Sequence, residues 1–153
     1  MNRALALGVA GRREIWADTW RMANDFWLTG VGVGAYQQGM LAYQQGSRQF
    51  FYNHAHNEYL QIFAEGGALL AVPVAVALIA GVVLIARRLR ADRSSLFWLR
   101  TGAAAGMIAV AVQSLWETGL RIPANAALFA ILAAIAAHES AEREQHAPRT
   151  RLP

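Results

Sequence analysis

The chain has 153 residues, enough for one modest domain, and 56% of them are hydrophobic whereas only 16% are charged. Cysteine and lysine are absent, which excludes a disulfide framework and thiolate chemistry and makes all 14 basic residues arginines. The net charge is +4, but the arginines flank apolar runs and form no basic stripe interleaved with aromatics, which argues against nucleic acid as a partner.

A helical period runs through residues 12–27. On a helical wheel one face is mainly apolar and the opposite face is polar. The apolar face carries Ile15, Trp16, Thr19, Trp20, Ala23, Phe26 and Trp27, and the polar face carries Glu14, Asp18, Arg21 and Asp25. The tryptophans predict that this helix lies at the membrane interface.

One arginine of this segment is a candidate anion-binding residue. Arg12 falls in the middle of the apolar face, Arg13 falls at its edge and Arg21 points away. A guanidinium on a packed face needs an anion or a carbonyl as its partner. The alternative is that Arg12 precedes the helix and is solvated.

A glycine run at residues 30–34 breaks the helix. No strand precedes it and its spacing differs from a dinucleotide fingerprint, so we expect a flexible turn, one in which backbone amides could approach a phosphate. Further on, Asn57 is expected to cap a short helix at residues 58–65, which Gly66 and Gly67 end.

The stretch HAHNEYLQIFAEGG at residues 54–67 stands immediately before an uncharged run. An ionisable imidazole at a membrane boundary is a candidate for function, although His and Asn are also common interfacial and capping residues. His54 and His56 could form half of a metal site. Their side chains would diverge on a helix and no nearby His–Glu pair completes a tetrahedral set, so no metal is expected.

Three apolar runs predict an all-α membrane protein with about three transmembrane helices, at residues 66–86, 96–116 and 120–137. Pro73 could kink the first, and Arg100 lies near one end of the second, where it could snorkel to the interface. The third run is short, and the alternative is a buried helix or a hairpin partner of the second. Abundant alanine and glycine indicate helices that pack in a bundle.

The arginine-rich link at 87–93 predicts the orientation, because short basic loops stay in the cytoplasm. Residues 1–65 would then form an extracytoplasmic, partly helical loop region, 66–137 the membrane helices, and 138–153 a polar cytoplasmic tail. In this arrangement His56 lies outside.

Four motifs occur in an order and at a spacing that resemble a known family. They are GRREIW at 11–16, GVGVGAY at 30–36, HAHNEYLQIFAEGG at 54–67 and RIPANAALFAILAAIAA at 121–137. Together they look like the C-terminal part of the O-antigen ligase / O-antigen polymerase family of multi-pass proteins in the bacterial inner membrane. The resemblance covers nearly the whole chain up to about Ala137.

The resemblance implies glycan transfer from an undecaprenyl-diphosphate carrier at the periplasmic face of the membrane, without a metal or another cofactor. Ligases transfer to the lipid A core, polymerases to a growing glycan and related members to protein. It assigns to His56, with Gly67 following, the base that takes the proton of the acceptor hydroxyl, and to Arg12 a diphosphate-binding role. Imidazole and guanidinium groups suit these tasks. The candidate catalytic residues are His56 and Arg12, and the candidate substrate-binding residues are Arg13, His54, Asn57, Glu65 and Gly67.

The chain also departs from the family pattern. Members have many more spans upstream and a second diphosphate-binding arginine there, and Trp27 stands where the family commonly has proline. We therefore expect a fragment of a larger helical bundle, inactive alone, that works with an upstream membrane half or other polysaccharide-assembly proteins. The alternative is a small membrane subunit or transporter-like protein without catalytic activity, although transport would want ionisable groups in mid-membrane, which the predicted spans lack.

Overall fold

The computed structural model describes residues 3–45 and 52–138 of the chain, and all regular structure within these ranges is helical. The all-α fold class is therefore confirmed for the described part. The helices are α1 (Arg3–Asp25), α2 (Tyr36–Tyr43), α3 (Glu58–Ala91), α4 (Phe97–Gln113), the short 3-10 helix η1 (Gly119–Arg121) and α5 (Pro123–Ala137).

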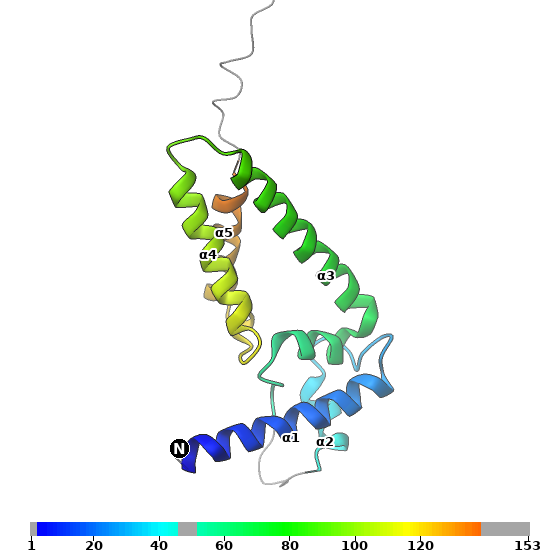
Figure 1. The fold of residues 1–153 in the computed structure, drawn as a ribbon. Helices are drawn as coiled ribbons and strands as arrows, with labels where there is room; N and C mark the ends of the chain where they lie inside the picture. The colour runs from blue at the N-terminus through cyan, green and yellow to red at the C-terminus, as the bar shows by residue number, and fades with distance from the viewer. Residues whose placement is uncertain (1–2, 46–51, 139–153) are drawn as a thin grey trace, which may run out of the picture.

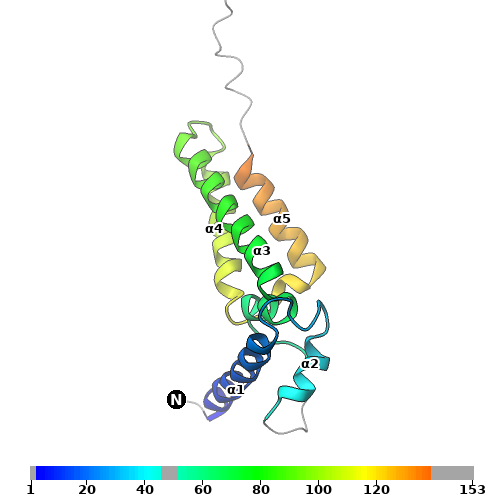
Figure 2. The same ribbon diagram turned by 90° about the vertical axis from the view of Figure 1, so that its right-hand side faces the viewer.

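The helices form two layers that we call the base and the upright layer. The base consists of α1, α2 and the first part of α3, and α1 runs across the bottom of the molecule (Figure 1). The upright layer consists of the rest of α3 together with α4 and α5, which run alongside one another in the second view (Figure 2). The link between α3 and α4 lies at the end of the molecule far from α1.

A sharp bend in α3 joins the two layers. At Gly67 the backbone has φ 58° and ψ −161°, a conformation that only glycine adopts readily. The bend deprives backbone groups on both sides of their helical partners, and the segment at residues 27–32 supplies replacements. The four bonds are Ala68 N–H to Trp27 C=O (2.7 Å), Leu69 N–H to Leu28 C=O (3.1 Å), Val31 N–H to Ala64 C=O (3.0 Å) and Gly32 N–H to Glu65 C=O (2.9 Å).

Two glycines make this crossing of backbones possible. A Cβ atom on Gly67 would collide with the backbone of Leu28, and one on Gly30, whose φ is 67°, would collide with the backbone of Glu65. The amides of Val31, Gly32 and Gly34 therefore bind α3, whereas that of Gly30 donates to the carbonyl of Phe26. The approach of the run to a phosphate stays a prediction, and these three amides would not be its donors.

The core of the base lies between α1, α2 and the start of α3. Its fully or almost fully buried members are Met22, Ala23, Tyr36, Met40, Ala55 and Ala64. Two of the expected apolar-face tryptophans of α1 do not belong to it, because Trp20 is 55% and Trp27 is 58% exposed. The buried face of α1 thus keeps Ile15, Thr19 and Ala23 of the predicted apolar face, but it is shifted toward Asp18 and Met22.

Polar contacts explain this shift of the buried face of α1. Thr19 and Tyr36 are buried and hydrogen-bond through their hydroxyl oxygens at 2.6 Å. Asp18 is also buried, where it pairs with Arg21 and accepts a hydrogen bond from the amide of Gln45 at 3.1 Å. The prediction that Asp18 lies on the polar face opposite the packed one was wrong, because its carboxylate is buried and finds donors inside the base.

The described residues contain one helix that is long and apolar enough to cross a membrane, α3. The predicted second and third spans correspond to α4, with 17 residues, and α5, with 15. At ~1.5 Å per residue these helices measure roughly 26 Å and 22 Å, less than a hydrocarbon core of ~30 Å. The bend in α3 is at Gly67, and the backbone around Pro73 stays helical.

The far ends of the upright helices are joined by arginines. Arg100 is buried, pairs with the buried Asp92 and donates to the carbonyl of Ala136 at 3.3 Å. Arg88 donates to the neighbouring carbonyl of Ala137. Cations suit the last carbonyls of a helix, so the two guanidiniums cap α5. The expectation that Arg100 snorkels to the interface was wrong, because a carboxylate and a helix end lie within its reach.

Candidate functional site

The segment that carries the two histidines is held through the backbone of Ala55. The amide of Ala55 donates to Oε1 of Gln61 at 2.9 Å, and its carbonyl accepts from the indole Nε1 of Trp16 at 2.8 Å. Ala55 is fully buried, and His56 beside it has a φ of 50°, in the left-handed region that residues other than glycine seldom occupy. These contacts hold the backbone from which His56 projects.

The next residue begins the helix. Asn57 is the N-cap of α3, and its side-chain oxygen accepts from the amide of Leu60 at 3.0 Å, which confirms the predicted cap. The amide of Glu58 donates to the carbonyl of Ser114 at 2.9 Å. The beginning of α3 is thus tied directly to the end of α4.

A single carboxylate brings the two predicted catalytic residues together. Oε1 of Glu117 lies 3.7 Å from a terminal nitrogen of Arg12, and Oε2 lies 3.6 Å from Nδ1 of His56. All three side chains are about half exposed, at 44% for Arg12, 43% for His56 and 47% for Glu117. Arg12, His56 and Glu117 come from α1, the α3 cap and the segment after α4, and together they form what we call the histidine cluster.

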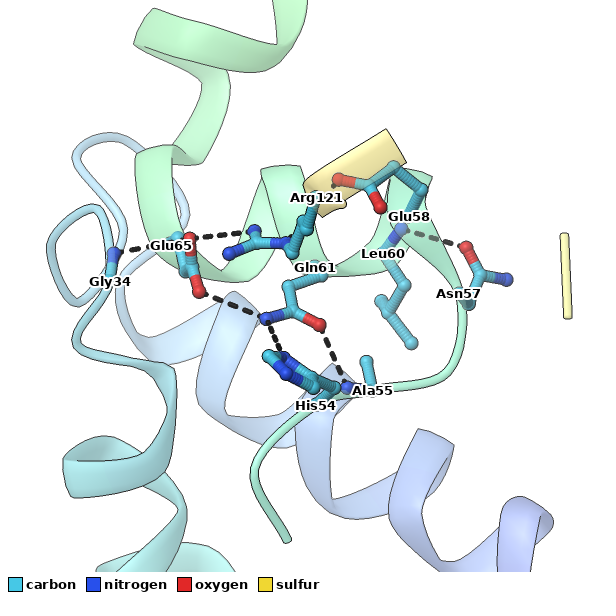
Figure 3. Close-up of polar contacts among 9 residues, drawn as sticks. All are labelled: Gly34, His54, Ala55, Asn57, Glu58, Leu60, Gln61, Glu65 and Arg121. Carbon is cyan, nitrogen blue, oxygen red and sulfur yellow. Dashed lines mark hydrogen bonds and ion pairs between the residues drawn. The ribbon is translucent and has the colours of Figure 1, made fainter. Parts of the chain in front are cut away.

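Arg121 does not pair with Glu117, although their spacing favours such a pair across one helical turn. It contacts two carboxylates of α3, with Nε 3.4 Å from Glu58 and a terminal nitrogen 2.9 Å from Glu65 (Figure 3). The segment after α4 unwinds into η1, which separates the two side chains. Arg121 thereby joins η1, which precedes α5, to the base.

Glu65 is the centre of a second polar network, drawn in Figure 3. It is 2% exposed and accepts from the amide of Gly34 at 3.2 Å and from Nε2 of Gln61 at 3.0 Å, in addition to Arg121. Nε2 of Gln61 also lies 3.3 Å from Nδ1 of His54. The network therefore runs from the glycine loop through α3 to the histidine segment.

His54 is exposed, yet the protein around it alters its titration. Partial desolvation lowers the pKa of its imidazole, and the positive charge of Arg121 and the neighbouring His56 act in the same direction. These effects favour the uncharged form of the imidazole. Its contact with Gln61 makes it part of the network around Glu65, whereas His56 belongs to the histidine cluster.

An open groove of about 520 Å³ lies beside the histidine segment. It is lined by Trp16, Trp20, Asn57, Tyr59, Leu60, Phe63 and Leu115. The polar atoms of Trp16 and Tyr59 are hydrogen-bonded within the protein: the indole donates to the carbonyl of Ala55, and the phenol donates to the carbonyl of Ala111 at 2.9 Å. The groove thus offers mainly apolar and aromatic surface.

The remaining predicted site residues occupy different places. Arg13 is exposed on α1, and Gly67 forms the bend, where its backbone meets the glycine loop. Among the described residues no three His, Asp, Glu or Cys side chains form a group that could hold a metal ion.

Sequence reasoning missed three residues that hold the site. Gln61 follows His54 by seven positions and precedes Glu65 by four, a spacing that could have indicated a contact on one helix face. No local sequence pattern indicates the contacts of Trp16 and Glu117, because their partners lie far away in the sequence.

A comparison with known protein families finds a match for the first half of the chain. Residues 2–75 match the model of a family described as O-antigen ligase. The matched range includes α1, the glycine loop, α2, the histidine segment and the bend of α3, and it stops before Glu117 and Arg121. Neither the curated proteins nor the solved structures contain a significant match to the chain.

Proposed function

We propose that this chain, which belongs to the O-antigen ligase family by its match over residues 2–75, serves in the transfer of a glycan from an undecaprenyl-diphosphate carrier to an acceptor hydroxyl. The observation that carries the proposal is the histidine cluster. A potential base and a potential diphosphate ligand, His56 and Arg12, lie on the same carboxylate at 3.6 Å and 3.7 Å.

His56 is the general base in this proposal. Its imidazole takes the proton from the acceptor hydroxyl while that oxygen forms a bond to the anomeric carbon of the donor sugar. The bond from this carbon to the phosphate oxygen breaks, and its electron pair leaves with the lipid diphosphate. The imidazolium then loses its proton to solvent, which its half-exposed position allows.

Arg12 is the diphosphate ligand. A guanidinium presents donors in a planar fork that matches phosphate oxygens and stabilises the charge of the leaving group. Arg13, exposed next to it on α1, adds a second cation, and the apolar groove offers surface for an isoprenoid chain. His54, Asn57, Glu65 and Gly67 support the site through the contacts described above.

The proposed location is the bacterial inner membrane, with His56 on the periplasmic side. Two features support this orientation: the arginine-rich link at 87–93 lies at the end of the molecule far from α1, and Arg121 lies beside the base. In this arrangement residues 1–65 are extracytoplasmic, 66–137 form membrane helices and 138–153 a cytoplasmic tail, which beyond His138 lies outside the described residues.

Replacement of His56 tests the proposal. In membranes that carry out glycan transfer with this protein, His56→Ala should reduce the rate by a factor of ~10²–10⁴, the usual contribution of a general base. Membrane insertion should be unchanged, because the half-exposed imidazole is not part of the core. His138→Ala, at the far end of α5, is the matched control and should retain full activity. Full activity of His56→Ala would disprove the general-base role.

A further inference from the structure

We propose that Glu117 is a positioning residue that couples donor binding to the action of the base. Its carboxylate orients the imidazole of His56 and holds Arg12 until the diphosphate of the donor takes Arg12 over. This inference rests on the proposed function of His56 and Arg12, but it concerns a residue outside the range that matches the O-antigen ligase family.

The first step of the argument is the orientation of the ring. Nδ1 of His56 is a buried atom without a hydrogen-bond partner, and the closest charged group on its side is Oε2 of Glu117 at 3.6 Å. A carboxylate accepts hydrogen bonds and cannot donate one when it is ionised. The proton of neutral His56 therefore belongs on Nδ1, facing Glu117, which leaves Nε2 as the nitrogen that can accept a proton.

The second step is how firmly the fold holds Glu117. The amide of Glu117 donates to the carbonyl of Gln113 at 3.1 Å, which continues the last turn of α4. That turn is bound to the beginning of α3, because Ser114 and Ala111 offer carbonyls to the amide of Glu58 and the phenol of Tyr59. The backbones that carry Glu117 and His56 are thus joined, and their separation does not depend on flexible loops.

The third step concerns the other charges near His56. His54, Arg121, Glu58 and Glu65 are further titratable groups near the histidine segment, and Arg121 is engaged by Glu58 and Glu65. Within the described residues, the carboxylate that faces His56 is therefore Glu117. It can stabilise the positive charge that the imidazole gains when it takes the proton.

The fourth step is the exchange of Arg12. The pair between Arg12 and Glu117 is half exposed and 3.7 Å long, and such surface pairs are weak. A diphosphate carries more negative charge than one carboxylate and accepts the guanidinium fork at two oxygens, so it competes successfully for Arg12. Once Arg12 has moved, the charge of Glu117 acts on His56 alone.

Glu117→Gln separates this role from that of an ordinary surface ion pair. In the full protein in membranes, we expect kcat to fall by ~10–100-fold, the usual loss when a group that orients a histidine is removed. The donor KM should stay equal or fall, because Arg12 no longer has a competing partner. Glu117→Asp should restore part of kcat, since it keeps the charge. Glu14→Gln, an exposed change on the same helix as Arg12, should leave both constants unchanged.

A binding measurement without turnover provides the second readout. Undecaprenyl diphosphate should bind to the Glu117→Gln protein equally well or up to ~5-fold more tightly than to the unchanged protein, the range expected when a weak competing pair is removed. Thermal unfolding of both proteins in detergent checks that the variant is folded, and Glu117→Ala, which also removes the charge, replaces it if it is not.

The outcomes distinguish this inference from the proposed function. If His56→Ala is inactive while Glu117→Gln keeps its kcat, the base stands and the positioning role fails. If the loss in Glu117→Gln lies entirely in a raised donor KM, Glu117 contacts the donor directly and the inference is also overturned. If His56→Ala is active, the proposed function itself fails.

Discussion

The backbone of Ala55 positions the neighbouring residue, His56, although the Ala55 side chain has no reactive group. Its amide and its carbonyl are bound by Gln61 and Trp16, and the next residue is His56. The sequence alone pointed to His56 and to the cap at Asn57, because an ionisable residue at a membrane boundary and a cap before a helix are local patterns. It could not point to Trp16, which lies 39 positions from Ala55 and has no periodic relation to it.

The arginines of α1 should divide into one that binds substrate and one that stabilises the fold. Arg12→Ala should raise the donor KM by ~10–100-fold, since a charge-assisted contact contributes ~1.5–3 kcal/mol, and Arg12→Lys should recover only part of this. Arg21→Ala should leave the donor KM unchanged but lower the melting temperature, because Arg21 pairs with the buried Asp18. Equal rises in KM for Arg12→Ala and Arg21→Ala would refute the assignment of Arg12.

Among the helices, α3 was predicted best and α1 least well. The sequence placed a cap at Asn57 and a break at Gly66 and Gly67, and the bend at Gly67 confirms the break, although the helix continues beyond it. For α1 the helix was predicted, and Ile15, Thr19 and Ala23 are buried as the wheel indicates. The wheel could not foresee that Asp18 is buried with them, because its donor at Gln45 lies in another segment.

The bend predicts a strong difference between two glycines of α3. Gly67→Ala should destabilise the protein by about 3 kcal/mol or more, because an unfavourable backbone conformation costs ~1–3 kcal/mol and the new Cβ collides with Leu28. Gly81→Ala should be neutral or stabilise by up to ~1 kcal/mol, since its Cβ meets nothing within 4 Å and alanine favours the helix. Thermal unfolding in detergent compares them. Similar melting temperatures for both variants would mean that the crossing at Gly67 does not hold the base.

At the scale of the whole molecule, the three predicted apolar runs all form helices, but only α3 is long enough by itself to cross a membrane. Hydropathy locates apolar segments well, yet it cannot tell a spanning helix from a shorter one that packs on its neighbour, as α4 and α5 do. The division of the chain at residues 65 and 137, and the inactivity of the chain on its own, stay predictions.

The orientation can be tested directly, because the protein has no cysteine of its own. A cysteine at Arg93, in the arginine-rich link, should resist an impermeant thiol reagent added to intact spheroplasts and react only after the membrane is opened. A cysteine at Asn53, next to the histidine segment, should react without permeabilisation. Both positions are exposed, so that a missing reaction reports the side of the membrane. Labelling of position 93 from outside would reverse the proposed orientation.

The crossing of residues 27–32 over the bend of α3 has a consequence for how the protein is made. The amides and carbonyls of this segment acquire their partners only after residues 64–69 have been synthesised, and until then the segment is a loop that has not closed. A straight α3 would satisfy its own backbone, but it would leave the amides and carbonyls of residues 27–32 without these partners. A chain can therefore be made in full and still lack the joint between this segment and α3, a fault that a measurement of abundance would not detect.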